Sequence, residues 1–445
     1  MKPEIRFHPA QFLAISFIAA IIVGTLLLLL PLSTKTGHIS FIDALFTATS
    51  GVCVTGLIVQ DTATYFTPFG QVVILVLFQL GGLGIMTFST LILLVAGRRV
   101  SMKDRIIIQE AFHYRATKDV KSLIKDIFIF ALILEAAGAL SFFLRWHKDF
   151  SWLRALFLSV FHSVSAFCNA GFSLFSESFL VYKGDAWINI TLLLLIVLGG
   201  LGFLVLQEGK EVFLRFMRKK QIKVSLHTKL VLTLTSFLIG SCFVLFLAIE
   251  WNHSLKMFTL KEKILSSLFQ VITPRTAGFN TLNLNTLSFA TVFLLIFLMF
   301  IGASPGSTGG GVKTSTMGAI FAFLKSKIAA RDSVNFFRRT LPAESITKAF
   351  TVVTLASGII FLSSFILLIA HPWAAMKDVL FEVFSAFSTV GLSLGITPKL
   401  STLGKAVIVL TMYIGRIGPL TLLYAFSRQK AFGRYEYVEE TVMIG

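Results

Sequence analysis

Long uncharged runs alternate with short polar stretches along the chain. A helix across a bilayer needs about 20 apolar residues. Four runs reach about that length, at Phe12–Leu30, Ile127–Leu144, Leu230–Ile249 and Ala349–Ala370. Each is followed by a shorter apolar stretch, at Phe41–Thr49, Leu156–Ser165, Ile264–Ile272 and Val379–Ser385. These stretches are too short to cross, so they predict re-entrant helices that enter and leave on one side.

A third apolar stretch follows every short one. These stretches lie within Thr62–Gly97, within Ala186–Gln207, from Leu287 onward and within Ala406–Ser427. Counting one crossing helix from each, the pattern predicts an all-α integral membrane protein. It has eight transmembrane spans plus four re-entrant pore helices, arranged as four span–pore-helix–span repeats around a central pore. The predicted repeats cover residues 1–97, 98–224, 225–330 and 331–445.

The stretch after each predicted pore helix is itself repeated. Its four copies read FTATSGVCVTG from Phe46, FHSVSAFCNAG from Phe161, LFQVITPRTAG from Leu268 and FSAFSTVGLSLG from Phe384. Their anchoring glycines, Gly56, Gly171, Gly278 and Gly391, recur roughly every 110 residues, which is too long a period for a solenoid and suits a duplicated membrane unit. Six residues before the glycine stands Ser50, Ser165 or Ser385, whereas the third copy has Ile272.

The end of each copy has the chemistry of a cation filter. The fourth reads T-V-G, as in potassium-channel filters, where backbone carbonyls replace the water around a dehydrated cation. The others read V-T-G, N-A-G and T-A-G, and one such tripeptide alone is equally an ordinary loop. Four copies in one chain favour a filter that binds potassium. Its expected ion-binding residues are Val54, Thr55, Gly56, Asn169, Ala170, Gly171, Thr276, Ala277, Gly278, Thr389, Val390 and Gly391.

A glycine-rich break interrupts the third repeat at residues 302–316, which read GASPGSTGGGVKTST. Five glycines and a proline do not sustain a helix, and lipid cannot solvate the freed amides, so the break must line a cavity. We expect a gate beneath the filter, with a simple helix kink as the alternative. The expected gate residues are Gly302, Ser304, Pro305, Gly306, Ser307, Thr308, Gly309, Gly310, Gly311, Lys313 and Arg416.

Three charges fall within apolar runs, where they are expensive. Arg416 must face the interior, and carbonyls or hydroxyls of Ser304, Ser307 and Thr308 are its expected acceptors; its role is either a barrier below the filter or a lock between two helices. Lys313 closes the break. Glu135 is expected to form an interhelical hydrogen bond or to serve transport. Shorter motifs, such as Gly81–Gly84 and Gly199–Gly202, indicate close helix packing.

Composition supports the membrane reading. The chain is 55% hydrophobic and 14% charged, with a net charge of +18. Most of its 40 Lys and Arg residues lie in segments 1–6, 98–125, 210–229, 325–348 and 428–445. Positive loops stay in the cytoplasm, so both termini are expected there, with the filter facing outward. The basic charge therefore reflects topology rather than nucleic-acid binding, and membrane lipid is the expected surrounding.

The chain offers little for catalysis or metal binding. Its three cysteines make neither a disulfide framework nor a zinc site, and its eight histidines include no H-E-x-x-H pair. No nucleophile–base constellation and no dinucleotide-binding G-x-G-x-x-G unit are found. We expect no enzyme and no organic cofactor in this chain.

The four filter-like loops, the break at 302–316 and Arg416 together resemble the Trk/Ktr/HKT superfamily of potassium transporters over nearly the whole length. The resemblance implies potassium uptake across the bacterial cytoplasmic membrane by a homodimer with two pores. It also implies that 302–316 is an intramembrane gating loop held by Arg416, and that a cytosolic, octameric RCK ring binding ATP or ADP is the partner. In related plant transporters a serine at the first filter glycine goes with sodium preference, so Gly56 favours potassium.

Two other functions remain open at this stage. One is a carrier that tightly couples sodium or protons to potassium, which a flux stoichiometry distinguishes. The other is a membrane receptor or scaffold whose filter repeats no longer transport.

Overall fold

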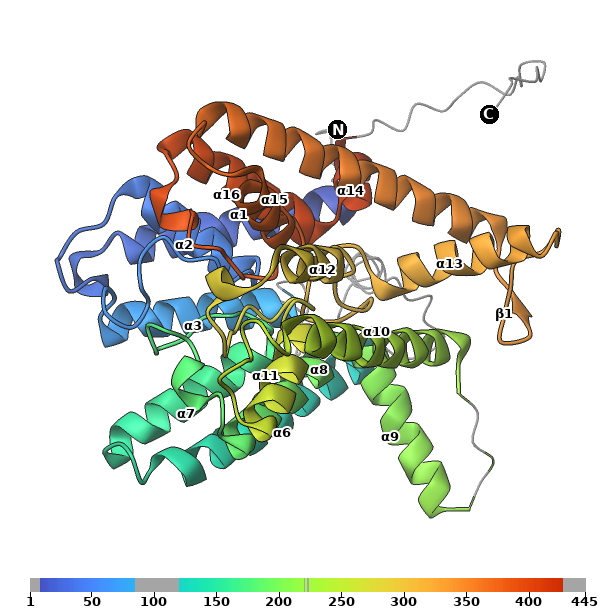
Figure 1. Cartoon of the computed structure of the whole chain (residues 1–445), viewed down its shortest axis with the longest axis horizontal. Helices are drawn as coiled ribbons and strands as arrows, with labels where there is room; N and C mark the ends of the chain where they lie inside the picture. Colours follow the sequence, from blue (N-terminus) through green and yellow to red (C-terminus); the bar gives the residue numbers. More distant parts are fainter. Residues whose placement is uncertain (1–8, 85–119, 220, 222–223, 427–445) are drawn as a thin grey trace, which may run out of the picture.

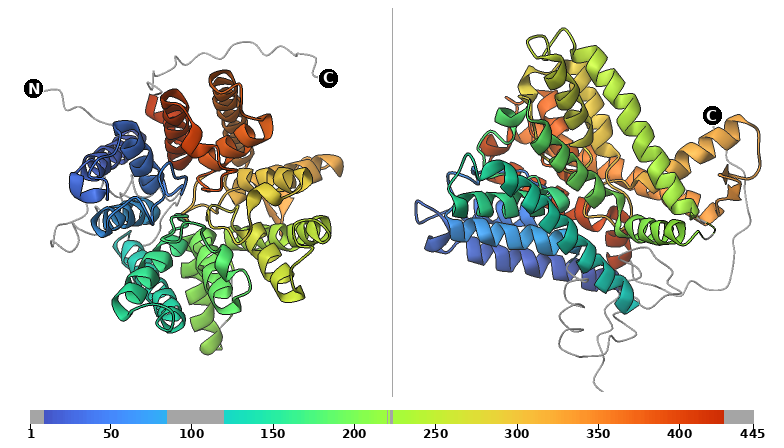
Figure 2. Two further views of the ribbon diagram at one scale, coloured as in Figure 1. Left: turned by 60° about the vertical axis from the view of Figure 1, so that its left-hand side comes forward. Right: turned by 90° about the horizontal axis from the view of Figure 1, so that it is seen from below.

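The computed structural model describes residues 9–84, 120–219, 221 and 224–426 (Figure 1). Segments 1–6 and 428–445, most of 98–125, and the boundary between the first two repeats at 97/98 lie outside the described residues. Figure 2 shows the helices gathered in four groups around a common axis, in the order of the sequence colours. Four successive parts of the chain therefore occupy four sectors around this axis.

Each sector begins with a long helix followed by a short one. The long helices are α1 (Pro9–Leu28), α6 (Val120–Trp146), α10 (Leu226–Glu250) and α14 (Ala343–Ala370). All four are long and apolar enough to cross a membrane. The short helices are α2 (Phe41–Val52), α7 (Trp152–Phe167), α11 (Leu260–Ile272) and α15 (Met376–Phe387). Both sets lie where the apolar pattern predicts helices.

The third helix of each sector is α3 (Pro68–Leu83), α8 (Ala186–Leu201), α12 (Phe289–Phe300) or α16 (Thr402–Ile417). After a break, the last three are followed by α9 (Phe203–Met217), α13 (Thr314–Ile328) and α17 (Pro419–Phe426), respectively. Minor elements are η1 (Pro31–Ser33), η2 (Leu180–Tyr182), η3 (Leu284–Thr286), η4 (Thr397–Lys399) and the strand pair β1 (Asn335–Phe336) and β2 (Arg339–Thr340).

Local caps set the starts of the helices that surround the axis. Before α11, the Thr259 hydroxyl accepts from the Glu262 amide while the Glu262 carboxylate accepts from the Thr259 amide, which is a capping box. Before α2, the Ser40 hydroxyl accepts from the Asp43 amide at 3.2 Å. These caps satisfy amide groups that have no partner inside the helix.

A buried ion pair joins the first and last sectors. Lys405 of α16 donates to Asp43 of α2 across 2.6 Å, and both side chains are largely buried. These residues are far apart in sequence but lie where the fourth sector meets the first. The pair therefore helps to close the circle of helices.

The glycine motif of the third helices has a specific packing role. A Cβ atom at Gly81, Gly199 or Gly415 would lie 1.9, 2.0 or 1.7 Å from the backbone carbonyl oxygen of Val52, Phe167 or Phe387, respectively. Val52, Phe167 and Phe387 are the last residues of three short helices. Only glycine permits this approach, so the predicted close packing is present.

The glycine motif at Gly199–Gly202 bends the chain as well as allowing close packing. The chain bends by 101° between α8 and α9 at Gly202, whose φ is +93°. From the sequence, packing rather than bending was favoured at this motif. A glycine at positive φ ends a helix at little steric cost, and a Cβ atom there would also lie 2.5 Å from the Pro305 carbonyl oxygen.

Candidate functional site

The four anchoring glycines meet in a closed ring at the centre of the molecule, here called the glycine ring (Gly56, Gly171, Gly278 and Gly391). Each approaches a carbonyl of the next loop so closely that a side chain is excluded. A Cβ atom would lie 2.5 Å from the Ala170 oxygen at Gly56, 3.0 Å from the Ala277 oxygen at Gly171, 2.5 Å from the Val390 oxygen at Gly278 and 2.2 Å from the Thr55 oxygen at Gly391. The sequence of contacts returns to its starting loop, so the ring is complete.

All four loops share one backbone shape. The ring glycines have φ of +87°, +73°, +77° and +92° in chain order. Two residues earlier, Val54, Asn169, Thr276 and Thr389 also have positive φ, between 52° and 73°. Such angles are unusual for side-chain-bearing residues, especially for β-branched ones. Their recurrence at the same four positions shows that the surrounding structure holds each loop in a strained conformation.

Hydrogen bonds to the short helices fix the loops. The amides of Thr55, Ala170 and Val390 donate to the carbonyls of Ser50, Ser165 and Ser385 over 2.7–2.8 Å. In the third loop the Ala277 amide donates to the Thr273 carbonyl at 2.9 Å. These bonds turn the amides toward the short helices.

The repeated serine has a role that its spacing alone did not reveal. The Ser50 hydroxyl accepts from the Gly56 amide at 3.0 Å, and the Ser385 hydroxyl accepts from the Gly391 amide at 3.1 Å. The third copy has Ile272 at this position, and there the neighbouring Thr273 hydroxyl donates to the Phe279 carbonyl instead. A hydroxyl thus ties each of these loops to its short helix.

The glycine-rich loop (residues 302–316) lies directly against two of the four ring loops and against the end of α7. Its Gly310 amide donates to the Thr389 hydroxyl at 2.9 Å. A Cβ atom at Gly309 would lie 2.1 Å from the Thr276 hydroxyl oxygen. Thr308 donates its hydroxyl to the Phe167 carbonyl at 3.4 Å. The structure therefore places this break beside the ring glycines and the loops that carry them.

The same loop is bonded to the broken helix of the second sector. Ser304 and Thr308 donate their amides to the carbonyls of Gly200 and Gly199 at 3.0 and 3.3 Å. In return, Phe203 at the start of α9 donates its amide to the Gly306 carbonyl at 2.9 Å. Backbone groups released by both breaks satisfy one another, as membrane depth requires.

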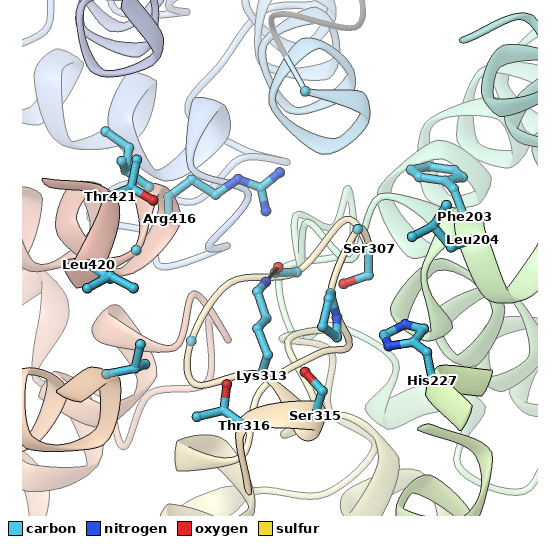
Figure 3. Close-up of a pocket in the computed structure, with 18 of the residues that line it drawn as sticks. Phe203, Leu204, His227, Ser307, Lys313, Ser315, Thr316, Arg416, Leu420 and Thr421 are labelled. Atoms are coloured by element: carbon cyan, nitrogen blue, oxygen red, sulfur yellow. Dashed lines mark hydrogen bonds between the residues drawn. The ribbon is translucent and has the colours of Figure 1, made fainter. Parts of the chain in front are cut away.

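Two cations hold the glycine-rich loop (Figure 3). The Arg416 guanidinium donates to the backbone carbonyls of Thr308 and Gly81. Lys313 donates its ammonium group to the Gly309 carbonyl at 2.7 Å. Among the expected acceptors of Arg416, the Thr308 carbonyl is used, whereas no hydrogen bond to Ser304 or Ser307 is present in the described chain. Gly81 was not among the acceptors expected from the sequence.

A cavity of ≈ 720 Å³ opens on the side of this loop away from the ring. Residues from all four sectors line it, including Gly82, Glu211, Lys313 and Arg416. Figure 3 shows Ser307, Ser315 and His227 around the same space. The glycine-rich loop therefore lies between the ring and a cavity lined by both apolar and polar residues.

Glu135 makes the interhelical hydrogen bonds that were expected of it. Its carboxylate accepts from the Gln79 amide of α3 at 3.0 and 3.1 Å. The Cys168 thiol, directly after α7, donates to the Gln79 side-chain oxygen at 3.2 Å. The cluster links the first sector, α6 and the second ring loop. Within the described residues, no group of histidine, cysteine and acidic side chains is arranged to hold a metal.

The fold and its central site define the class of protein. A family model described as the cation transport protein TrkH matches residues 6–435. The chain belongs to this family of cation transport proteins. It is also similar, at 20% identity and a TM-score of 0.74, to the crystal structure of the potassium transporter TrkH from Vibrio parahaemolyticus, covering 96% of this chain and 86% of that one. The expected all-α membrane fold and family are confirmed.

Curated relatives extend over the full length. The chain is 41% identical to the Ktr system potassium uptake protein B of Bacillus subtilis (strain 168), covering 95% of this chain and 94% of the relative. It is 36% identical to the potassium/sodium uptake protein NtpJ of Enterococcus hirae, covering 100% and 99%. It is 37% identical to the Ktr system potassium uptake protein B of Vibrio alginolyticus, covering 98% and 94%.

Proposed function

We propose that this protein carries potassium into the cell through the glycine ring, with the glycine-rich loop as its gate. The observation that carries the proposal is the closed ring itself. Four loops from one chain bring four carbonyl-bearing tripeptides together, and their amides are turned toward the short helices. Carbonyls on the central side then replace the hydration shell of a dehydrated cation. The twelve filter residues predicted from the sequence are the proposed ligand segments, with potassium as the transported ion.

Electrostatics favour a cation at the ring. The four short helices end at Val52, Phe167, Ile272 and Phe387, just before the ring loops. A helix C-terminus carries partial negative charge, and four of them converge near the axis. A negative-inside membrane potential adds about 2.3 kcal/mol per charge for each 100 mV of inward movement. No metabolic reaction is needed at the ring, in keeping with a transport protein rather than an enzyme.

The gate proposal rests on the position of the glycine-rich loop between ring and cavity. Arg416 and Lys313 place two positive groups there, where they oppose a passing cation. Opening requires the hydrogen bonds to Thr308 and Gly309 to break or move. Packed segments of this kind switch between discrete arrangements.

The proposed arrangement in the cell follows the charge pattern and the family. Eight spans cross the cytoplasmic membrane, four pore helices re-enter, both termini face the cytoplasm and the ring faces outward. Two copies form a homodimer. An octameric RCK ring that binds ATP or ADP docks on the cytoplasmic side and moves the loop. The relatives named as Ktr system proteins support a multi-component system.

Rubidium uptake into vesicles containing the purified chain tests the transport proposal. Uptake driven by a negative-inside potential supports it, and uptake no higher than in protein-free vesicles contradicts it. The relative named for potassium and sodium uptake favours one further candidate, coupling to sodium. Omitting sodium from both sides distinguishes a coupled carrier, which stops, from a potential-driven pore, which continues. Adding the ring with ATP or ADP tests its regulation separately.

A further inference from the structure

Helix α9 (Phe203–Met217) has two different faces. Gln207, Glu208 and Glu211 line the central cavity. On the other side, Phe213, Phe216 and Met217 are each more than 60% exposed. These three residues are spaced i, i+3 and i+4, so they share one side of the helix. The helix is therefore polar toward the cavity and apolar toward its surroundings.

The orientation of α9 is set by the bend at Gly202. Helix α8 has 16 residues, and at a rise of 1.5 Å per residue it is about 24 Å long. Trp187, near its outer end, is exposed, as is typical of membrane–water interfaces. The hydrocarbon core is about 30 Å thick, so α8 ends about 6 Å short of the inner boundary. A helix that turns by 101° at this depth runs along the boundary.

Positive charge gathers at the end of α9. Arg215 has Glu211 within 3.9 Å, and Lys210 has Asp126 within 3.4 Å. Arg218 and Lys219 follow directly and are exposed, and within the described chain neither is paired with a carboxylate. Exposed aromatic side chains beside unneutralised cations are complementary to a surface of acyl chains and anionic headgroups.

We propose that α9 lies in the inner membrane boundary and binds anionic lipid. Its apolar face, formed by Phe213, Phe216 and Met217, contacts the acyl chains, and Arg218 and Lys219 at its end contact the headgroups. The proposal rests on the orientation given under the proposed function. It also places a lipid contact next to the gate, because the Phe203 amide at the start of α9 donates to the Gly306 carbonyl.

The position of α9 is tested by spin labels on the full chain in vesicles. Phe216→Cys and Gly209→Cys place labels on the apolar face; Phe216 is exposed, and a Cβ atom at Gly209 meets nothing within 4 Å. Glu211→Cys, on the cavity face, is the matched control. The native cysteines are buried, so the new thiol reacts first. We expect the first two labels to be relaxed by oxygen at least about threefold more than by a water-soluble nickel complex, with the reverse at 211.

Two results overturn the position. Labels at 209 and 216 that the nickel complex reaches as easily as at 211 place α9 in water. Labels that neither reagent reaches place it against protein, such as a second copy of this chain. The measurement does not depend on transport, so loss of rubidium uptake with labels in lipid contradicts the transport proposal alone.

The headgroup preference is tested by lipid composition. In phosphatidylcholine vesicles containing increasing phosphatidylglycerol, the oxygen-to-nickel ratio at residue 216 should rise at least about twofold. Arg218→Gln/Lys219→Gln should abolish the rise. Lys256→Gln/Lys261→Gln, at two exposed lysines just before and in the first turn of α11, should retain it. A ratio independent of phosphatidylglycerol, or equal responses of the two double variants, overturns the anionic preference.

Discussion

Arg416 donates to the backbone carbonyl of Thr308, joining the last sector to the glycine-rich loop. The same guanidinium reaches the Gly81 carbonyl in the first sector. One side chain therefore connects three of the four sectors at the level of the proposed gate.

Replacing Arg416 by alanine should raise ion flux. The substitution removes both hydrogen bonds and a positive charge beside the proposed path, so the loop is released and the barrier falls. We expect initial rubidium uptake to rise about tenfold, equivalent to about 1.4 kcal/mol. Deleting Gly306–Gly311 should act in the same direction. Arg416→Lys is the control, because lysine keeps the charge but lacks the planar fork that reaches two carbonyls.

If Arg416→Ala and the Gly306–Gly311 deletion are both well folded and take up rubidium at the wild-type rate, the loop is a kink rather than a gate. A rise with alanine but not with lysine would assign the effect to the charge.

Introducing a side chain into the glycine ring should reduce selectivity. In Gly56→Ser the new Cβ atom meets the Ala170 carbonyl oxygen at 2.5 Å, so a proposed ligand carbonyl must move. We expect sodium to compete about tenfold better against rubidium uptake, a change of about 1.4 kcal/mol. Gly395→Ser is a matched control, since Gly395 has φ of +90° but no atom within 4 Å of its Cβ position. Equal competition in the two variants would remove Gly56 from the filter.

Removing the donor of Glu135 should destabilise the protein without changing selectivity. Gln79→Ala leaves a carboxylate that is 8% exposed without its amide partner. Loss of such a bond costs about 1–3 kcal/mol, which should lower the unfolding temperature in detergent. Ser141 lies on the same helix as Glu135, and its hydroxyl forms a neutral hydrogen bond with the Thr191 hydroxyl at 2.9 Å. Ser141→Ala breaks this bond and should cost less. A larger drop for Ser141→Ala would show that the Glu135 cluster contributes little.

The ion pair between the first and fourth sectors should show strong coupling. Lys405→Met leaves Asp43 largely buried without its partner, at a cost of about 3 kcal/mol or less because some solvent remains. Adding Asp43→Asn should restore part of the loss. Lys348→Met, which breaks an exposed pair with Glu344, is the control and should have little effect. Additive losses in the double variant would mean that Asp43 and Lys405 act independently.

The apolar pattern was sufficient to locate the long and short helices. The length of an apolar run and its lack of charge depend directly on whether the helix lies in an apolar environment. The ring loops followed from repeated glycines, and all four glycines proved to lie together. The bend between α8 and α9 was not favoured from the sequence, because a glycine serves packing and bending equally well. Only the φ of Gly202 distinguishes the two. Gln79 escaped notice because its partner Glu135 lies in another repeat, and contacts between repeats leave no periodic signal.

The glycine ring also determines how the protein responds to mutation. A homotetrameric channel changes all four positions of a ring with each codon, whereas here every position has its own codon. One substitution therefore alters a quarter of the ring and leaves three loops intact. The two residues before each ring glycine differ among the copies, as V-T, N-A, T-A and T-V, whereas all four ring positions are glycine. Under the proposed function, laboratory libraries can adjust ion preference in small steps, one sector at a time.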